Sequence, residues 1–383
     1  MHKSAALLPC IVSIFILSGH ASDSVSARAP ESVVGDAPPD PGKLATDLSP
    51  ALKPTDIRAA MRKVADWQTA RSADEPSREW PFAILYDGLL SAAKTLNDPR
   101  YSRQVLQVAQ HYAWTLGPKQ GDADDQAIGQ SYLYLYGDAP SIASIQPLKS
   151  DFDALLQLPD NPAKPVWWWA YALYMAPPVW SGLTAATGDP KYLDYMDRQW
   201  HLSSNLLWDQ REHLYFRDST YFDRRESNNR KLFLSRANGW AMAGLVRVIE
   251  YLPESDLRRA FYIQQLREMA AAVSHLQSSD GLWRPGLLDA AGYPNPEASS
   301  SAFFVYALAW GINHRLLSRE QYLPVVRKGW AGLVSHIYAD GRLGCIQPVG
   351  ASGDYPPGAS SVYGVGAFLL AGSQVNALAA RRN

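Results

Sequence analysis

The strongest constraint on the fold is a helical repeat of apolar residues that short capped turns interrupt. Over 85–96, apolar side chains recur three and four positions apart, as in a helix with one buried face. The sequence Asn-Asp-Pro at 97–99 ends this stretch, since Asp98 can cap free amides and Pro99 suits the first turn of a new helix. Gly-Asp-Pro at 188–190 follows another apolar helix in the same way. The sequence therefore predicts antiparallel helix pairs joined by tight turns.

Further stretches with this pattern cover most of the chain. Helices are expected at 125–136, 240–251, 256–277, 300–313, 319–338 and 363–378. Small side chains near helix starts let helices pack closely around a crowded axis, and glycine recurs there at Gly88, Gly129, Gly182, Gly239 and Gly366. Helix pairs repeated about every 40 to 60 residues predict one all-α domain, an (α/α)6 toroid, with an open helical solenoid as the alternative.

Strand signals are few and local. The segments 214–216 and 231–234 flank a polar stretch and are expected to pair as a short hairpin. Asp-Gly at 280–281 and at 340–341 are strong turn signals. We expect these hairpins and turns at one rim of the ring, because loops at a rim commonly build a pocket.

The start of the chain differs in character from the rest. A basic start precedes an apolar run at 5–17, and small residues precede a cleavage point after Ala21. This pattern predicts a secretory signal at 1–21, which is too short to span a bilayer, and a flexible leader at 22–54 before a single domain at 55–383. No second long apolar run stands out. We therefore expect an exported protein, periplasmic or secreted, that does not stay in a membrane.

Charge and cysteine content exclude several classes of protein. Lys plus Arg is 36 and Asp plus Glu is 37, so no field of one sign favours nucleic acid. A hydrophobic share of 47% and a charged share of 19% exclude general disorder. Cys345 is the single cysteine outside the signal, which excludes an intramolecular disulfide and favours a buried, inert thiol. The histidines lack metal-ligand spacing, so no metal or cofactor is expected.

Several segments carry residues suited to sugar chemistry. They are Asp-Asp-Gln-Ala-Ile-Gly-Gln at 124–130, the tryptophan-rich segment at 167–178, Ser-Arg-Ala-Asn-Gly-Trp at 235–240, Leu-Trp-Arg at 282–284, Pro-Glu at 296–297 and Tyr-Ala-Leu-Ala-Trp-Gly-Ile-Asn at 306–313. In this order, over about 58–377, they resemble the unsaturated rhamnogalacturonyl hydrolases of glycoside hydrolase family 105 and the related unsaturated glucuronyl hydrolases of family 88.

The resemblance implies a six-hairpin (α/α)6 barrel that works without a metal. It also implies an acidic oligosaccharide substrate, left by a polysaccharide lyase acting on a polymer such as pectin, with a 4,5-unsaturated uronic acid at its non-reducing end. Family members protonate the vinyl-ether double bond, add water at C5, and release the sugar when the hemiketal opens. A protonated carboxyl of raised pKa suits this proton transfer. The oligomeric state is not predicted.

One departure falls on the residue that this mechanism needs most. Tyr171 stands where the family has its catalytic Asp, four residues before Met175, and Gln126 stands where the family usually has His. A phenol is a weaker acid than a carboxyl. Three hypotheses therefore stay open: a hydrolase with modified chemistry or another acid, a lyase based on Tyr171, and a catalytically inactive sugar-binding protein.

The candidate site residues each have a functional and a structural interpretation. Asp125 and Tyr171 are the catalytic candidates, although Asp125 at a helix start could serve only as a cap. Arg236 is the candidate for holding the uronate carboxylate with a bidentate fork, and Arg217 lies where relatives often carry a substrate-contacting His. The other candidates for substrate binding, which could equally be core residues, are Gln126, Asn238, Met175, Trp169, Trp240 and Trp283. Asp87 is a further carboxylate that could replace the missing acid.

Overall fold

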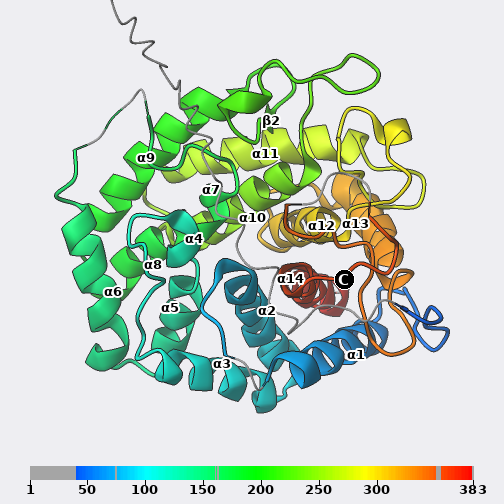
Figure 1. The fold of residues 1–383 in the computed structure, drawn as a ribbon, viewed down its shortest axis with the longest axis horizontal. Helices are drawn as coiled ribbons and strands as arrows, with labels where there is room; N and C mark the ends of the chain where they lie inside the picture. The colour runs from blue at the N-terminus through cyan, green and yellow to red at the C-terminus, as the bar shows by residue number, and fades with distance from the viewer. Residues whose placement is uncertain (1–39, 74–75, 160, 162–163, 351–354, 382–383) are drawn as a thin grey trace, which may run out of the picture.

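The helices form two concentric rings (Figure 1). The computed structural model describes residues 40–73, 76–159, 161, 164–350 and 355–381, so the predicted signal at 1–21 and the first part of the leader lie outside the described residues. Within this part of the chain, the inner ring contains α2 (Trp80–Leu96), α5 (Gly129–Asp138), α8 (Pro177–Thr187), α10 (Ser235–Tyr251), α12 (Ala298–Asn313) and α14 (Val362–Ala380). The outer ring contains α1 (Pro54–Ser72), α3 (Pro99–His111), α6 (Ile142–Leu155), α9 (Lys191–Leu207), α11 (Arg259–His275) and α13 (Arg319–Val334).

Packing between neighbouring inner helices closes the ring. In chain order, α2 packs against α5, α5 against α8, α8 against α10, α10 against α12, and α12 against α14. The last of these helices, α14, also packs along α2. Since the last inner helix contacts the first, the predicted (α/α)6 toroid is confirmed and the open solenoid is excluded.

Two glycines allow the closing contact between α2 and α14. A Cβ atom added to Gly88 would lie 2.5 Å from the carbonyl oxygen of Gly366. A Cβ atom added to Gly366 would lie 2.1 Å from the carbonyl oxygen of Ile84. No real Cβ atom fits at such distances, so the two backbones touch because both side chains are missing, as predicted for a crowded axis.

The inner helices all begin at the same end of the ring. Because each inner helix follows an antiparallel outer helix, the six inner helices of the described chain run parallel to one another. Side chains from the first two turns of three of them meet there: the ring of Trp80 lies 5.9 Å from Trp240 and 5.4 Å from Tyr363. Helix N-termini carry partial positive charge, so this end, the mouth of the ring, favours an anion.

The turns between paired helices have the predicted form. Asp98 accepts a hydrogen bond from the amide of Arg100 at 3.1 Å, and Asp189 accepts one from the amide of Lys191 at 3.1 Å. The helix predicted at 125–136 is divided into α4 (Ala123–Gln126) and α5. A second one-turn helix, α7 (Ala172–Met175), precedes α8, where two prolines lack amide hydrogens.

The predicted hairpin exists, but with a different partner. Strand β2 (Leu214–Tyr215) pairs with β1 (Trp208–Asp209), and not with 231–234. A tight turn explains the difference, because Asp209 accepts hydrogen bonds from the amides of Arg211 and Glu212 and returns the chain at once. Short 3-10 turns follow at η1 (Ser219–Tyr221) and η2 (Ala290–Gly292).

Residues 40–53, which were predicted to belong to the leader, lie against the ring. Leu44 forms an isolated bridge with Tyr338, and the amide of Ala45 donates to the carbonyl of Ile337 at 2.8 Å. The described chain therefore begins to pack on the domain before α1.

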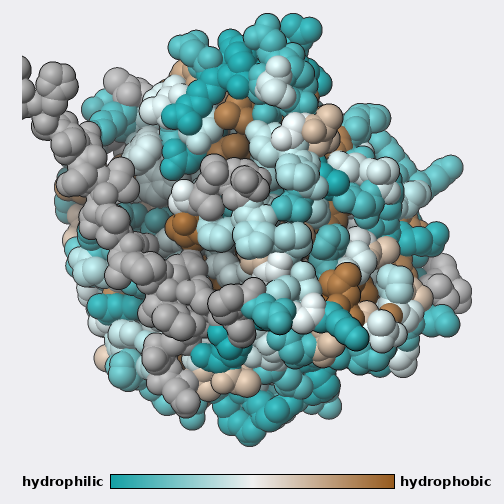
Figure 2. Space-filling model, turned by 45° about the vertical axis from the view of Figure 1, so that its right-hand side comes forward, coloured by the Kyte–Doolittle hydropathy of each residue, from teal (hydrophilic) through white to brown (hydrophobic). Residues whose placement is uncertain are grey.

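Helix α14 is apolar and long enough to cross a membrane by length and composition, which the sequence analysis overlooked. Most of the helix, 78% of the apolar window, is buried inside the ring. On the face drawn in Figure 2, hydrophobic side chains form small separate patches among hydrophilic ones. The large hydrophobic residues that the described chain exposes are scattered: Leu44, Ile142, Leu158, Val166, Trp168, Leu257 and Val349.

Candidate active site

Tyr171 lies half-buried at the mouth of the ring, directly before α7. The amide of Ala170 donates to the carbonyl of Arg217 at 2.8 Å, which fixes this segment against the chain that follows β2. The ring of Tyr171 packs on Trp240 of α10 with a centroid distance of 6.4 Å. Its hydroxyl has no hydrogen-bond partner among the described residues, so it is available to a ligand.

Two guanidinium groups flank the ring of Tyr171. The guanidinium carbon of Arg217 lies 5.8 Å from the ring centroid, and that of Arg236 lies 6.0 Å from it. At these distances the cations are attracted to the ring face and create a positive potential around the phenol. The structure thus brings together Tyr171, Arg217 and Arg236, three of the residues singled out from the sequence.

Arg236 is fixed by Tyr363 on α14 and by the segment that precedes this helix. It donates to the hydroxyl of Tyr363 at 3.2 Å and to the carbonyl of Gln347 at 3.4 Å. Burial alone would lower the pKa of Arg236, but Tyr363, Tyr171 and Glu297 together raise it above its ordinary value. The guanidinium therefore stays charged and faces a site that suits a carboxylate.

Aromatic rings form the floor of this mouth. Trp240 is buried and packs on Tyr174, Phe303 and Tyr363 at centroid distances of 5.3, 4.4 and 5.8 Å. Trp80, at the start of α2, is only half-buried and covers Trp240 edge-on. Trp80 is thus the ring of this group that a sugar can reach.

Two carboxylates near the mouth, Glu297 and Asp218, are already bonded. Glu297 is fully buried and accepts from the amide of Ser300 at 2.6 Å and of Gln347 at 3.1 Å, so it caps α12. Asp218 is buried and paired with Arg217. The phenol of Tyr171 and the guanidiniums of Arg217 and Arg236 therefore lie together at the mouth, whereas Glu297 and Asp218 are already bonded.

Asp125 is placed beneath a loop and not in the open mouth. It is 3% exposed, and its Oδ2 accepts from the amide of Lys119 at 2.9 Å. The loop packs directly on it, because a Cβ atom at Gly117 would lie 2.4 Å from the Asp125 carboxyl. Asp125 can assist chemistry only if residues 117–119 move aside.

Gln126 has a structural environment. Its Nε2 donates to the carbonyl of Gln120 at 2.7 Å, and its Oε1 accepts from the indole of Trp180 at 3.1 Å. Both ends of the amide are therefore used to hold α4 against α8.

Three more candidates lie away from the mouth or inside the core. Asn238 is fully buried and exchanges hydrogen bonds with the backbone of Tyr215 at 2.8 and 3.1 Å, which ties β2 to α10. Trp283 is also fully buried and donates to the carbonyl of Val273 at 2.7 Å. Met175 is 1% exposed. By contrast, Trp169 is half-buried and packs on the exposed Trp168 at 4.8 Å.

Asp87 lies deeper in the ring and not at the mouth. Its carboxylate accepts from Ser131 at 2.9 Å and from Tyr174 at 3.0 Å, and lies 3.7 Å from the guanidinium of Arg247. Burial raises the pKa of Asp87, and Arg247 opposes that effect. Asp87 is thus a buried structural group that cannot replace the missing acid without a large rearrangement.

Trp80 and Tyr363 are not among the site residues predicted from the sequence. A usable signal existed, because the first turns of all inner helices meet at one end of an (α/α)6 ring, and Trp80 and Tyr363 lie in such turns. Asp218 is next to the candidate Arg217 in the sequence, which suggests it as the ion-pair partner of Arg217, and the structure confirms that pair.

The described residues contain no group of three or more His, Cys, Asp or Glu side chains that could hold a metal ion. Cys345 is buried, and burial raises the pKa of its thiol to about 12. It is therefore protonated at neutral pH and unsuited to nucleophilic attack.

The chain is similar to known carbohydrate-active proteins over most of its length. Residues 57–379 match the family Glycosyl Hydrolase Family 88. A protein of Formosa agariphila named unsaturated 3S-rhamnoglycuronyl hydrolase is 36% identical over 346 residues, which cover 85% of this chain and 91% of that protein. The solved structure of a polysaccharide lyase is 30% identical with a TM-score of 0.79, and the match covers 84% of this chain and 96% of that one. A family 88 protein from Bacteroides vulgatus is 26% identical with a TM-score of 0.80, over 85% of this chain and 99% of that one.

Proposed function

Since the chain belongs to glycosyl hydrolase family 88 and is a glycoside hydrolase, we propose that it removes the unsaturated uronic acid from rhamnoglycuronyl oligosaccharides. The name of the relative that is 36% identical supports a rhamnoglycuronyl substrate over a galacturonyl fragment of pectin. The observation that carries the proposal is the placement of Arg217 and Arg236 beside Tyr171, with their guanidinium carbons 5.8 and 6.0 Å from the centroid of its ring.

Each group at the mouth has a role in this proposal. Arg236 binds the uronate carboxylate, because its guanidinium is charged and held by Tyr363. The hydroxyl of Tyr171 gives a proton to C4 of the double bond, and Arg217 and Arg236 stabilise the phenolate that forms. Water adds at C5 and returns a proton to the phenolate, after which the hemiketal opens and releases the remaining sugar.

The origin and place of the substrate are part of the same proposal. The unsaturated ring is the product of a polysaccharide lyase, so this chain acts after such an enzyme. The signal pattern at 1–21 supports export to the periplasm or out of the cell, where large polysaccharides are cut.

Loss of ultraviolet absorbance tests the reaction, because hydration removes the double bond that absorbs. We expect the native protein to bleach an unsaturated rhamnoglycuronyl disaccharide. Arg236→Ala should lower kcat/KM by about 100-fold, equivalent to roughly 2.7 kcal/mol, as it removes a charged hydrogen-bonding partner. Arg103→Ala removes an exposed arginine on α3 and should leave the rate unchanged. Full activity of Arg236→Ala would disprove this role.

A second activity, β-elimination by Tyr171, is favoured by one feature of the mouth. A phenol stands there beside two guanidiniums, while Glu297 and Asp218 are buried, and one similar structure at 30% identity is a polysaccharide lyase. In this reaction the Tyr171 phenolate takes the C5 proton of a saturated uronate, and a carbanion stabilised by Arg236 forms. The C4–O bond then breaks to leave the double bond, and the phenol returns the proton to the leaving oxygen.

The same assay separates the two activities. Hydration lowers the absorbance of an unsaturated oligosaccharide, whereas elimination raises the absorbance of a saturated rhamnoglycuronyl polymer. An increase on the saturated polymer with no loss on the unsaturated disaccharide would replace the first proposal by the second. A protein that binds both and changes neither would be a sugar-binding protein.

A further inference from the structure

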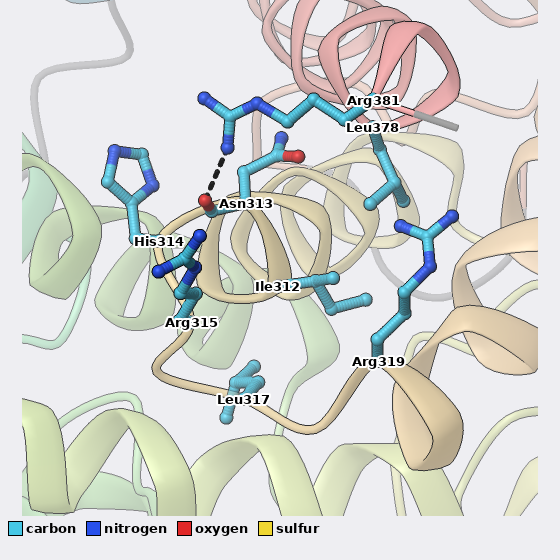
Figure 3. Close-up of a pocket in the computed structure, with 8 residues that line it drawn as sticks. All are labelled: Ile312, Asn313, His314, Arg315, Leu317, Arg319, Leu378 and Arg381. Carbon is cyan, nitrogen blue, oxygen red and sulfur yellow. Dashed lines mark hydrogen bonds between the residues drawn. The ribbon is translucent and has the colours of Figure 1, made fainter. Parts of the chain in front are cut away.

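A cavity lies where α12 and α14 end (Figure 3). It has a volume of about 700 Å³ and is bordered by the ends of α12 and α14 and the start of α13. Helix α12 begins beside the mouth, where Ser300 bonds to Ser235 at 2.9 Å, and ends at Asn313 in this cavity. Its 16 residues span about 24 Å, so the two sites are well separated.

The border of this cavity is basic. Arg315, Arg319 and Arg381 line it together with His314, and no carboxylate residue lies among its lining residues. Arg381 donates to the carbonyl of Asn313. Among the described residues, no carboxylate pairs with Arg315 or Arg319. Two guanidiniums are thus left for an outside anion.

Other arginines at this end of the ring behave differently. Arg259 donates to the carbonyls of Ile249 and Leu252, and Arg267 donates to the carbonyl of Leu316 at 3.1 Å. These bonds satisfy carbonyls at or near helix ends, where cations are favourable. No such bond holds the side chain of Arg315 or Arg319 within the described chain, so capping does not explain their presence.

Asn313 adds an acceptor to the cavity. The residue is 8% exposed, and its Nδ2 donates to the backbone and side-chain oxygens of Gln374, both at 3.0 Å. Its Oδ1 is buried and has no hydrogen-bond partner among the described residues. An unmatched buried acceptor costs free energy, and a sugar hydroxyl can supply the missing donor when the side chain of Asn313 turns toward the cavity.

The backbone at Arg315 supports a role for its side chain. Its φ is 60°, in the left-handed region where a residue after a helix end is usually Gly or Asn. A side chain there is strained, which costs about 1 kcal/mol relative to glycine. The presence of arginine at this strained position is explained if its guanidinium binds a ligand.

We propose that this cavity is a second binding site for an oligosaccharide that carries carboxylate or sulfate groups. Arg315 and Arg319 bind the anionic groups, Asn313 accepts from a hydroxyl, and Leu317 contacts an apolar face of the sugar. The site holds substrate or polymer on the enzyme without taking part in the reaction, and the proposal does not depend on the chemistry at Tyr171.

Calorimetric titration with trigalacturonate tests the site in the full-length protein. Arg236→Ala, which weakens the mouth, should still bind the trisaccharide. Adding Arg315→Ser and Arg319→Ser to that protein should weaken the remaining binding at least 10-fold. Asn313→Asp should also weaken it, since it keeps the size of the side chain but adds a negative charge. Neutral maltotriose should not bind, and sodium sulfate alone should bind more weakly than the trisaccharide.

The matched control removes two exposed arginines elsewhere, Arg103→Ser with Arg327→Ser, and should leave binding unchanged. In the native background, Arg315→Ser with Arg319→Ser should keep kcat/KM for a disaccharide within about twofold, because the mouth is remote. Unchanged trisaccharide affinity in the Arg315 and Arg319 variant would overturn the proposal. Equal affinity for maltotriose, or for sulfate alone, would overturn it as well.

Discussion

The carboxylate of Asp218 is ion-paired with the guanidinium of Arg217, its neighbour in the sequence. Asp218 is 2% exposed and also accepts from the amide of Thr220 at 2.8 Å, which anchors it to the 3-10 turn η1. Arg217 lies at the mouth, and its guanidinium is ion-paired with Asp218, which is itself fixed by the turn. Asp218 is thus a positioning residue for one of the two cations beside Tyr171.

Replacing Asp218 by Asn should loosen Arg217 without removing the turn. Asn keeps an oxygen for the amide of Thr220 but lacks the charge that holds the guanidinium. We expect KM for the unsaturated disaccharide to rise about 10-fold, roughly 1.4 kcal/mol, with a smaller change in kcat. Asp223→Asn, at an exposed position nearby, is the control. An unchanged KM would show that Arg217 does not bind substrate.

Replacing Tyr171 should reveal which group delivers the proton. On ordinary unsaturated galacturonides we expect weak or absent hydration by the native protein, because a phenol is a weaker acid than a carboxyl and these sugars are not the proposed rhamnoglycuronyl substrate. Tyr171→Asp should increase the rate of absorbance loss at least 10-fold, and Tyr171→Phe should abolish any hydration or elimination that the native protein shows. Tyr136→Phe, outside the mouth, should change neither. A native rate that Tyr171→Phe leaves intact would place the acid elsewhere, and Asp125 beneath its loop would be the next candidate.

The crossing of α2 and α14 should be intolerant of a single methyl group. Gly366→Ala would place Cβ 2.1 Å from the carbonyl oxygen of Ile84, so the helices must separate along their closing contact. We expect a loss of more than about 3 kcal/mol in the free energy of unfolding, measured by urea denaturation. Gly137→Ala, in α5 with no atom within 4 Å of the new Cβ, should be neutral or stabilise by about 0.5–1 kcal/mol. If the two substitutions changed the free energy of unfolding equally, the contact between α2 and α14 would not be as tight as described.

The arrangement of helices could be predicted from the sequence because its signals are local. Turn residues such as Asp98 act within a few positions, and apolar periodicity marks each buried face. Strand pairing was harder to predict, since 214–216 could pair with either neighbour. The tight turn around Asp209 decided it, and its hydrogen bonds to nearby amides become visible only in the structure.

The site could be predicted only in part, because burial and hydrogen bonding decide which motif residues reach the mouth. Tyr171, Arg217 and Arg236 meet there, as their motifs suggested. Asn238 stands two residues after Arg236 on the same helix, yet its amide is used by the backbone of Tyr215. The spacing of two polar residues along one helix does not show which of their side chains will hydrogen-bond to the backbone of a neighbouring strand.

Stability at neutral pH should depend on a buried carboxylate in the rim loops. Glu226 is 7% exposed, its Oε2 accepts from the hydroxyl of Tyr293 at 2.8 Å, and its Oε1 has no partner among the described residues. Burial raises the pKa of Glu226 above its ordinary value of 4.5. The bond from Tyr293 lowers it and the charge of Asp289 raises it further.

The sign of the effect follows from this raised pKa. Below the ordinary value both folded and unfolded chains carry the proton, and Glu226 costs nothing. As pH rises from there to the folded pKa, the unfolded chain ionises first, so the folded state loses stability. Glu226→Gln cannot ionise and keeps an acceptor for Tyr293, so it should exceed the native free energy of unfolding by about 1 kcal/mol at pH 7 and equal it near pH 4. Urea denaturation of both proteins across this range measures the difference, and the exposed Glu254→Gln should show none. A difference that does not vary with pH would mean that Glu226 titrates normally in the folded protein.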